Sequence, residues 1–313
     1  MAPIAEKRGS LPPNIRFIQR GWLNCNSILL LGDGGPVLVD SGYESFAAET
    51  ERLVRFAGVD PASLKRIVTT HGHSDHHGGN ARLKGLSGAE IVMGVQTAVW
   101  IANNDRHHLW LDYLGQEATL VPADRAVADG DWLTLAGMAF LVIASPGHAP
   151  DAISLYQPDL KLLLCADAMW ENDVGILNTA VHGPQVLDAA IATLERFAIL
   201  EINMALPGHG NPIPNVPENI AQIRQRLARF RREPAQMALH LVRRATMFNL
   251  LRFQPISPKA FIERCLAWPW LFDYAPLAGF GHPRPLLETL LDEFLNRGLI
   301  QQQDDQLITN LPK

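Results

Sequence analysis

The sequence has few cysteines, no long apolar run and no low-complexity segment. Its three cysteines, Cys25, Cys165 and Cys265, are far apart and form no C-x-x-C motif, which argues against a disulfide framework or a cysteine-based zinc site. No apolar run approaches the ~18 residues that cross a bilayer, and residues 1–14 lack the apolar segment of a signal peptide. We therefore expect a soluble, cytoplasmic protein with buried thiols and no membrane partner.

Charged residues are also sparse, and they are unevenly distributed. They make up 19% of the 313 residues, whereas apolar residues make up 47%, which is enough for a large core. Residues 216–313 carry 13 Lys and Arg against 9 Asp and Glu, although the whole chain has a net charge of -5. A proline- and glycine-rich stretch, PGHGNPIPNVP, lies at this change of charge. We predict one domain over residues 1–215 and a second over residues 216–313.

Short aliphatic runs alternate with longer helical stretches in the first domain. The runs predict buried strands at 36–40, 67–70, 89–93, 138–144, 160–165 and 202–206. Leu187, Ile191, Leu194 and Ala198 recur at helical spacing and predict a helix over 184–200. Strands mixed with helices indicate a layered α/β domain.

Residues with metal-binding side chains follow four of these strands. The strand at 67–70 runs into HGHSDH, which contains His71, His73, Asp75 and His76. The strands at 138–144, 160–165 and 202–206 are followed by His148, Asp167 and His209. A string of the form H-x-H-x-D-H is expected by chance in on the order of one chain in a thousand. A shared site at one edge of the sheet is therefore favoured over unrelated histidines.

The composition of this set of ligands indicates a catalytic centre with two metal ions. Five histidines and two carboxylates are too many for one tetrahedral ion. They suit two divalent ions about 3.5–4 Å apart, bridged by a carboxylate and a water-derived hydroxide, with positions left for substrate. Imidazole and carboxylate ligands favour Zn2+, with Mn2+ and Fe2+ as alternatives.

The motifs HGHSDH, SPGH, CAD and PGHG, in this order after strands, resemble those of the metallo-β-lactamase superfamily over residues 14–212. VLVDSG, which contains Asp40, resembles the family's first motif. The resemblance implies an αββα sandwich of two mixed β-sheets flanked by helices. It also implies the role of each residue. One ion would take His71, His73 and His148, the other would take Asp75, His76 and His209, and Asp167 would bridge them. Asp40 would orient a ligand by hydrogen bonding.

Some members of the superfamily differ from this chain at identifiable positions. Exported β-lactamases generally lack the bridging aspartate, and hydroxyacylglutathione hydrolases usually carry C-G-H-E where this chain has Pro-Gly-His209-Gly. Diflavin oxygen reductases carry glutamate at the position of His73, together with a flavodoxin domain. These differences disfavour antibiotic, glutathione-thioester and redox chemistry, and leave other glyoxalase II-like or lactamase-like hydrolases.

The second domain is expected to be small, mainly helical and winged-helix-like. Ile220, Ile223, Leu227 and Phe230 form an apolar stripe on a helix whose other faces are rich in arginine. A second amphipathic helix over 285–298 is followed by two short apolar runs around QQQDDQ, which predict a hairpin. Such a domain resembles the one appended to lactamase-like endoribonucleases. In this chain the domain would hold RNA, pack over the active-site mouth or form a homodimer.

Two segments are candidates for contact with substrate. Trp170 and Asn172 follow closely on Asp167, so they cannot lie far from it. His107, Trp110 and Tyr113 lie in a segment that borders the metal cleft in relatives. An ordinary amphipathic helix with its tryptophans in the core is the alternative for this second segment.

Together these features predict a metal-dependent hydrolase. It would use a metal-bridging hydroxide on a small-molecule ester, thioester or lactone, with Asp75 orienting the hydroxide and accepting its proton. The alternative is a metal-dependent endoribonuclease or phosphodiesterase that uses the C-terminal domain and its arginines to hold RNA. A non-catalytic metal-binding protein is disfavoured because no ligand is missing.

Overall fold

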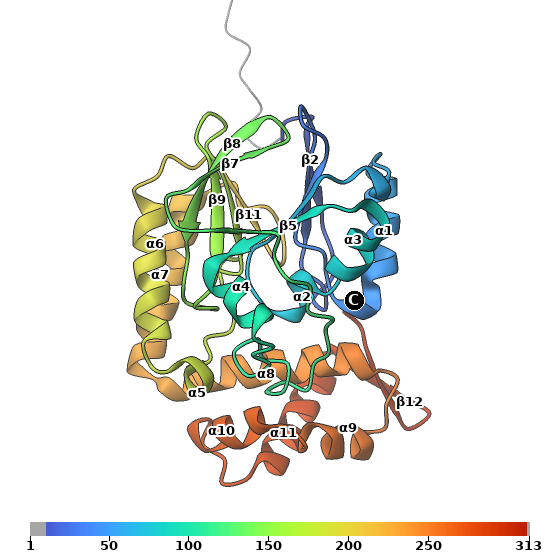
Figure 1. The fold of residues 1–313 in the computed structure, drawn as a ribbon. Coiled ribbons are helices and arrows are strands. Elements are labelled where there is room, and N and C mark those ends of the chain that lie inside the picture. The colour runs from blue at the N-terminus through green and yellow to red at the C-terminus, as the bar shows by residue number, and fades with distance from the viewer. Residues whose placement is uncertain (1–10, 312–313) are drawn as a thin grey trace, which may run out of the picture.

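Two mixed β-sheets packed face to face form the centre of the structure, a computed structural model that describes residues 11–311 (Figure 1). Helices cover the outer face of each sheet, and further helices from the C-terminal part lie across one end of the sandwich (Figure 1). This arrangement is the predicted αββα sandwich with an appended, mainly helical part. The segment in which no signal peptide was found lies largely outside the described residues, because the description starts at residue 11.

The first sheet contains six strands in chain order: β1 (Ile15–Ile18), β2 (Ser27–Leu30), β3 (Val37–Val39), β4 (Arg66–Thr69), β5 (Glu90–Gly94) and β6 (Arg125–Val127). β1, β2 and β3 pair antiparallel, whereas β3 to β6 pair parallel, with Leu38 opposite Ile67 and Ile67 opposite Ile91. β3 and most of β4 and β5 are buried, which explains their continuous apolar sequence.

The second sheet contains five strands in the order β11 (Met204–Pro207), β10 (Leu162–Ala166), β9 (Ile153–Gln157), β8 (Met138–Ala144) and β7 (Trp132–Leu135). β8 and β10 both pair antiparallel with β9, and β11 pairs parallel with β10. β8, β10 and β11 therefore run in the same direction. Their carboxyl ends lie at the same end of the sheet.

Apolar side chains hold the layers together. Between the sheets, Val39 and Val68 of the first sheet belong to one cluster with Phe140, Leu155 and Leu164 of the second. The first sheet is covered by α1 (Ala47–Phe56), α3 (Asn80–Ser87) and α4 (Val95–Ala102), and the second by α6 (Val186–Ala198) and α7 (Val216–Arg232). The remaining short elements of this part are η1 (Glu44–Phe46), η2 (Pro61–Ser63), α2 (Ser74–His77) and α5 (Thr179–His182).

The C-terminal part consists of α8 (Pro234–Phe253), α9 (Pro258–Cys265), α10 (Pro269–Leu277), α11 (Pro283–Asn296) and the hairpin of β12 (Ile300–Gln303) and β13 (Gln306–Thr309). Its core includes the fully buried Trp270 and Tyr274, and Leu23 and Trp110 of the sandwich join the same cluster. The helix followed by a hairpin is confirmed, and the winged-helix class stays a prediction. None of the helices in the described part of the chain has the length and apolar character needed to cross a bilayer.

The predicted boundary at residue 215 also stays a prediction, and the packing of α7 bears on it. α7 follows that boundary, yet its apolar stripe, from Ile220 to Phe230, belongs to one cluster with Leu194 of α6 and Leu163 of the second sheet. α7 thus packs as an outer helix of the sandwich, and α8 is the first helix of the C-terminal core.

Most predicted elements of the sandwich are confirmed. The six strands correspond to β3, β4, β5, β8, β10 and β11, and the helix over 184–200 corresponds to α6, with ends that differ by at most two residues. Five strands were not predicted: β1, β2, β6, β7 and β9. Four of these five have only three or four residues, which is too short for a clear periodic pattern.

Candidate metal centre

The seven predicted metal ligands lie at the carboxyl ends of strands from both sheets. β4 ends at Thr69, and the loop and short helix α2 that follow carry the four ligands of HGHSDH. His148, Asp167 and His209 follow β8, β10 and β11, which run in the same direction. The structure brings all seven side chains together, although they are far apart in the sequence.

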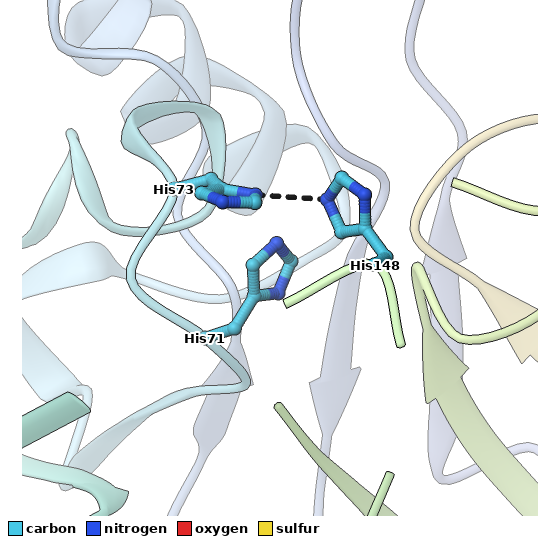
Figure 2. Close-up of side chains that lie close together, drawn as sticks. All are labelled: His71, His73 and His148. Atoms are coloured by element: carbon cyan, nitrogen blue, oxygen red, sulfur yellow. Dashed lines mark hydrogen bonds between the residues drawn. The ribbon is translucent and has the colours of Figure 1, made fainter. Parts of the chain in front are cut away.

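The first group of ligands consists of His71, His73 and His148. One ring nitrogen from each lies within 4.8 Å of the others, and all three side chains are buried. Nδ1 of His73 and Nε2 of His148 are 2.8 Å apart, and Figure 2 shows the three imidazoles gathered around a common point. This is the trio that the family resemblance assigns to one ion.

The second group consists of Asp75, His76 and His209, whose candidate ligand atoms also lie within 4.8 Å of one another. Nε2 of His209 is 3.1 Å from Oδ2 of Asp75, and Nε2 of His76 is 3.7 Å from the same oxygen. This trio matches the one that the resemblance assigns to the other ion.

Asp167 lies between the two groups. Its Oδ2 is 3.5 Å from Nε2 of His148, in the first group, and 3.7 Å from Nε2 of His209, in the second. Its Oδ1 is 3.6 Å from Nε2 of His76. Two atoms bound to one tetrahedral zinc at about 2.0–2.1 Å would lie roughly 3.4 Å apart. The observed separations are close to that value, so the carboxylate is placed to serve both ions.

The buried imidazoles lack the partners that buried polar atoms normally have. Among residues 11–311, no protein group hydrogen-bonds to Nε2 of His71, His73 or His76, or to Nδ1 of His209. An unpartnered polar atom in the interior is costly unless something else satisfies it. Nε2 of His76 faces Asp75 and Asp167, and Nε2 of His71 is the nitrogen of its ring that does not contact Thr70, so these two unpartnered atoms fit bound metal ions.

The charges of the cluster fit metal ions as well. Burial, followed by repulsion between neighbouring imidazoles, lowers the pKa of His71 and His73 well below the usual value, so both rings stay neutral and keep a lone pair. Burial alone would lower the pKa of His76, yet the carboxylates of Asp40, Asp75 and Asp167 outweigh it and raise this pKa well above the usual value. The centre therefore favours positive charge, which divalent ions supply.

Hydrogen bonds from outside the cluster orient several of the ligands. Nδ1 of His76 donates to Oδ2 of Asp40 at 2.8 Å, which turns Nε2 of His76 toward Asp75 and Asp167. Asp40 also accepts hydrogen bonds from the backbone N–H and the hydroxyl of Thr70. This is the orienting contact expected for Asp40.

Two further contacts hold His148 and Asp167. Nδ1 of His148 donates to the carbonyl oxygen of Ile176 at 2.8 Å, which directs Nε2 into the cluster. Nε1 of Trp170 donates to Oδ1 of Asp167 at 3.1 Å. The carboxylate between the two groups thus has a fixed orientation without a metal ion being required to hold it.

The absence of a side chain at Gly208 leaves room for the cluster. A Cβ atom on this residue would lie 2.1 Å from Oδ1 of Asp167 and 3.0 Å from Cε1 of His76. Neither ligand can move away without leaving the group to which it belongs. Only glycine therefore fits beside these ligands.

The cluster opens onto a cavity of about 380 Å3. Five of the predicted metal ligands, His73, Asp75, His148, Asp167 and His209, line one end of this cavity, called the metal-binding end below. Most of the remaining wall is apolar or aromatic. Trp22, Trp110, Leu114, Trp170 and Ile176 belong to the sandwich, and Met247, Phe248, Leu251 and Phe294 belong to the C-terminal helices. Such a cavity is suited to a small molecule with apolar groups.

Two of the five predicted substrate contacts line this cavity. Trp110 stacks on His73 with ring centroids 3.9 Å apart, and its Nε1 donates to Nε2 of His182 at 2.9 Å. Trp170 packs edge-on against His209 with ring centroids 5.1 Å apart. Each indole therefore both touches a ligand and forms part of the cavity wall.

The other three, His107, Tyr113 and Asn172, do not line this cavity. His107 is exposed on its loop, and the buried Tyr113 donates its hydroxyl hydrogen to Asp273 of the C-terminal part. The backbone N–H of Asn172 donates to the side chain of Asn219, which places Asn172 in the wall of a neighbouring cavity.

Several residues of the site were not predicted from the sequence. Trp22 stacks on His209 with parallel rings, and Gln116 also lines the cavity. Asp151 accepts hydrogen bonds from the N–H of Gly72 and the hydroxyl of Thr97, both at 2.8 Å, and so holds the HGHSDH loop. The position of Asp151, three residues after His148, was the one sequence signal that could have identified it. An isolated tryptophan such as Trp22 carries none.

Cys25 lies beside the cluster without fitting the role of a ligand. Its sulfur is close to His76 and Asp40, and it is fully buried. Burial raises the pKa of this thiol to about 11, so it is neutral at physiological pH, whereas a metal ligand needs the thiolate. All three cysteines are free and buried, as expected.

Comparisons with known proteins agree with this geometry. The family model of the metallo-beta-lactamase superfamily matches residues 20–209. The chain is 28% identical to the thioesterase pkgB of Emericella nidulans over 67% of this chain and 54% of that protein. It is 34% identical to a hydroxyacylglutathione hydrolase of Brucella anthropi over 64% of each. The alignments thus span only part of the length of these two curated relatives.

Solved structures show the same architecture. A metallo-beta-lactamase family protein from Thermus thermophilus has a TM-score of 0.59 at 20% identity, covering 96% of this chain and 100% of that one. A subclass B3 metallo-beta-lactamase of Bradyrhizobium japonicum has a TM-score of 0.58 at 22% identity, covering 74% of this chain and 95% of that one. At such identities the likeness establishes the fold alone.

Proposed function

The chain belongs to the metallo-β-lactamase superfamily and is a hydrolase, and we propose that it cleaves small-molecule esters, thioesters or lactones that carry an apolar group. One observation carries this proposal: the seven clustered side chains open onto a cavity whose other walls are mainly apolar and aromatic. An apolar group of the substrate would occupy these walls, while the bond to be cleaved would lie at the metal-binding end.

The metal ions proposed for the site are two zinc ions, with Mn2+ and Fe2+ as the alternatives for the same ligands. His71, His73 and His148 would hold one ion, Asp75, His76 and His209 the other, and Asp167 would contact both. When bound, such ions lower the pKa of water toward ~7 and polarise the substrate's carbonyl oxygen.

The chain's own residues would position the reactants. The carboxylate of Asp75 lines the cavity and would orient the attacking water and accept its proton. The indoles of Trp22, Trp110 and Trp170 surround the metal-binding end and would exclude bulk water. Asp40 would keep the ring of His76 in place, because its carboxylate accepts the hydrogen bond from Nδ1 of His76.

Thioesters have the most support among the three kinds of bond. Both curated relatives named above, a thioesterase and a hydroxyacylglutathione hydrolase, carry names that refer to thioester cleavage. The apolar walls do not distinguish a thioester from an oxygen ester or a lactone. A direct comparison of substrates is therefore needed.

The alternative of an RNA-cleaving enzyme has less support. Arg224 and Arg231 of α7 pair with Glu195 and Asp188 of α6, so this side of the helix is not an open basic face for an RNA backbone. RNA binding by the C-terminal part, a homodimer and a cytoplasmic location stay predictions.

A hydrolysis panel on purified protein of known metal content tests the proposed function. We expect cleavage of at least one class among acyl thioesters, aryl esters and lactones, and the rate on uncharged substrates should not fall as salt rises from about 50 to about 200 mM. Cleavage of single-stranded RNA alone, with binding that weakens steeply over the same salt range, would support the alternative instead.

A further inference from the structure

A second cavity, of about 540 Å3, adjoins the first. Arg243 and Arg244 line both cavities, so this pair of side chains forms the partition between them. The two spaces differ in character, because the second is lined mainly by polar and basic groups of α7 and α8, among them Gln222, Arg226 and Arg229. Among the described residues, no carboxylate lines it.

The acids outside this cavity do not balance its arginines. Arg226 and Arg244 share Asp173, Arg243 and Arg297 share Glu293, and Arg229 pairs with Glu233. These contacts set the four guanidinium groups that line the cavity against three carboxylates, and one of these, Glu293, is shared with Arg297, which lines only the first cavity. His240 adds no positive charge at neutral pH, because burial lowers its pKa to about 4. An excess positive charge of one therefore remains around the cavity.

The guanidinium groups also keep donors that the protein does not use. Within residues 11–311, no protein group accepts a hydrogen bond from Nη1 of Arg226, Arg243 or Arg244. A guanidinium has five N–H donors in a fixed fork, which matches the oxygens of a carboxylate or a phosphate. The cavity thus offers both the charge and the donors that an anionic group requires.

The arginines of this cavity lie close to the proposed metal centre. The guanidinium of Arg244 lies 5.7 Å from the ring centroid of Trp170, and that indole is in turn 5.1 Å from the ring of His209. Only Trp170 therefore separates Arg244 from a proposed metal ligand. Because Arg243 and Arg244 also line the first cavity, a molecule bound at its inner end can contact them from within that cavity.

We propose that the second cavity is an anion-binding site that holds the carboxylate- or phosphate-bearing end of the substrate, while the apolar acyl group lies in the first cavity. This inference rests on the proposed function, since it specifies the class of ester or thioester that the enzyme cleaves. The substrate is amphipathic, with its charge on the side of the scissile bond away from the apolar acyl group.

Four substrates with the same hexanoyl group test this proposal. Two are neutral, p-nitrophenyl hexanoate and hexanoyl-N-acetylcysteamine, one carries carboxylates, S-hexanoylglutathione, and one carries phosphates, hexanoyl-coenzyme A. In the metal-loaded variant R226Q/R229Q we expect kcat/KM to fall about tenfold or more for a charged substrate, mainly through KM, and to stay unchanged for the neutral ones. The charged substrate whose kcat/KM falls shows whether the site binds a carboxylate or a phosphate.

The matched control is Arg231→Gln, which removes an arginine from the same helix but lines neither cavity. It should leave all four values of kcat/KM unchanged. An equal loss for all four substrates in R226Q/R229Q, or no loss for any of them, would overturn the proposal.

Direct binding separates this proposal from the proposed function. Titration of the metal-loaded enzyme with inorganic phosphate should show one more bound phosphate in the wild type than in R226Q/R229Q. If the wild type cleaves none of the four substrates and no lactone of the hydrolysis panel but shows this difference, the proposed function is wrong and the anion site stands. If the difference is absent, the anion site is wrong whatever the enzyme cleaves.

Discussion

The carboxylate of Asp40 accepts a hydrogen bond from Nδ1 of His76 at 2.8 Å and two more from Thr70, one of them from the backbone. It thereby ties the end of β3 to the residue after β4 and to a proposed metal ligand at once. The orientation of His76 depends on a carboxylate that accepts all three hydrogen bonds.

Asp40→Asn should weaken metal binding without unfolding the protein. The amide keeps the shape of the side chain, but its NH2 group must face a donor from either Thr70 or His76. Loss of such an orienting partner typically lowers metal affinity about 10- to 100-fold. Competition with a chromophoric chelator measures this change. An affinity equal to that of the wild type would show that the Asp40 contact does not matter for metal binding.

Gly208→Ala should displace Asp167 and reduce the metal content. The added Cβ would lie 2.1 Å from Oδ1 of Asp167, a distance that forces one of the two to move. We expect at least one ion to be lost and activity to fall about 100-fold or more. Metal analysis and hydrolysis rates provide the readout.

The control for this change is Gly85→Ala, on α3, where an added Cβ meets no atom within 4 Å. It should retain both ions and full activity. If Gly208→Ala retained them too, the close packing inferred around Asp167 would be wrong.

Phe248→Ala should change the preferred length of the acyl group. Phe248 of α8 lines the cavity, so its removal lengthens the space available to the substrate. Each additional CH2 group that becomes buried is worth about 0.8 kcal/mol, or roughly fourfold in kcat/KM. A series of p-nitrophenyl esters of increasing chain length measures the shift toward longer chains.

Phe272→Ala, on the exposed surface of α10, should leave this chain-length profile unchanged. An unchanged profile in Phe248→Ala would show that the acyl group does not occupy the wall formed by α8.

His240 should make the folded state less stable in mild acid. Burial lowers its pKa from 6.5 to about 4, although a hydrogen bond to Asp173 partly opposes this shift. Between pH 6.5 and 4 the unfolded chain therefore binds a proton that the folded chain does not. Stability rises with pH across this window and is lost as the pH falls, by about 2 kcal/mol between pH 7 and 5.

His240→Gln should accordingly reduce the loss of stability between about pH 7 and pH 5, as measured by urea unfolding at both values. His107→Gln, which changes an exposed histidine, is the control and should behave like the wild type. The same loss of stability in His240→Gln and in the wild type would contradict the assignment.

The ligands could be predicted from the sequence because each lies in the segment that follows a strand. The direction of the strand decides at which end of the sheet that segment lies. β8 was predicted with its observed bounds, and His148 comes four residues after its end. Asp40 also belonged to a recognisable motif. In such cases the local sequence contains both the strand and the residue that the strand positions.

The cavity wall could not be predicted in the same way. Trp22, Phe248 and Arg244 reach the cavity from segments that are distant in the sequence. The placement of Phe248 and Arg244 depends on how α8 packs across the end of the sandwich, and an amphipathic pattern shows which face of a helix is buried but not what it is buried against. Tyr113 illustrates the converse, since it was predicted to contact substrate and instead pairs with Asp273 of α10.

The most direct test of the account is anomalous diffraction at the zinc absorption edge from crystals of the metal-loaded protein. We predict two peaks about 3.5–4 Å apart, one among His71, His73 and His148 and the other among Asp75, His76 and His209, with Asp167 in contact with both. A single peak, or peaks that Asp167 does not contact, would contradict a centre with two metal ions.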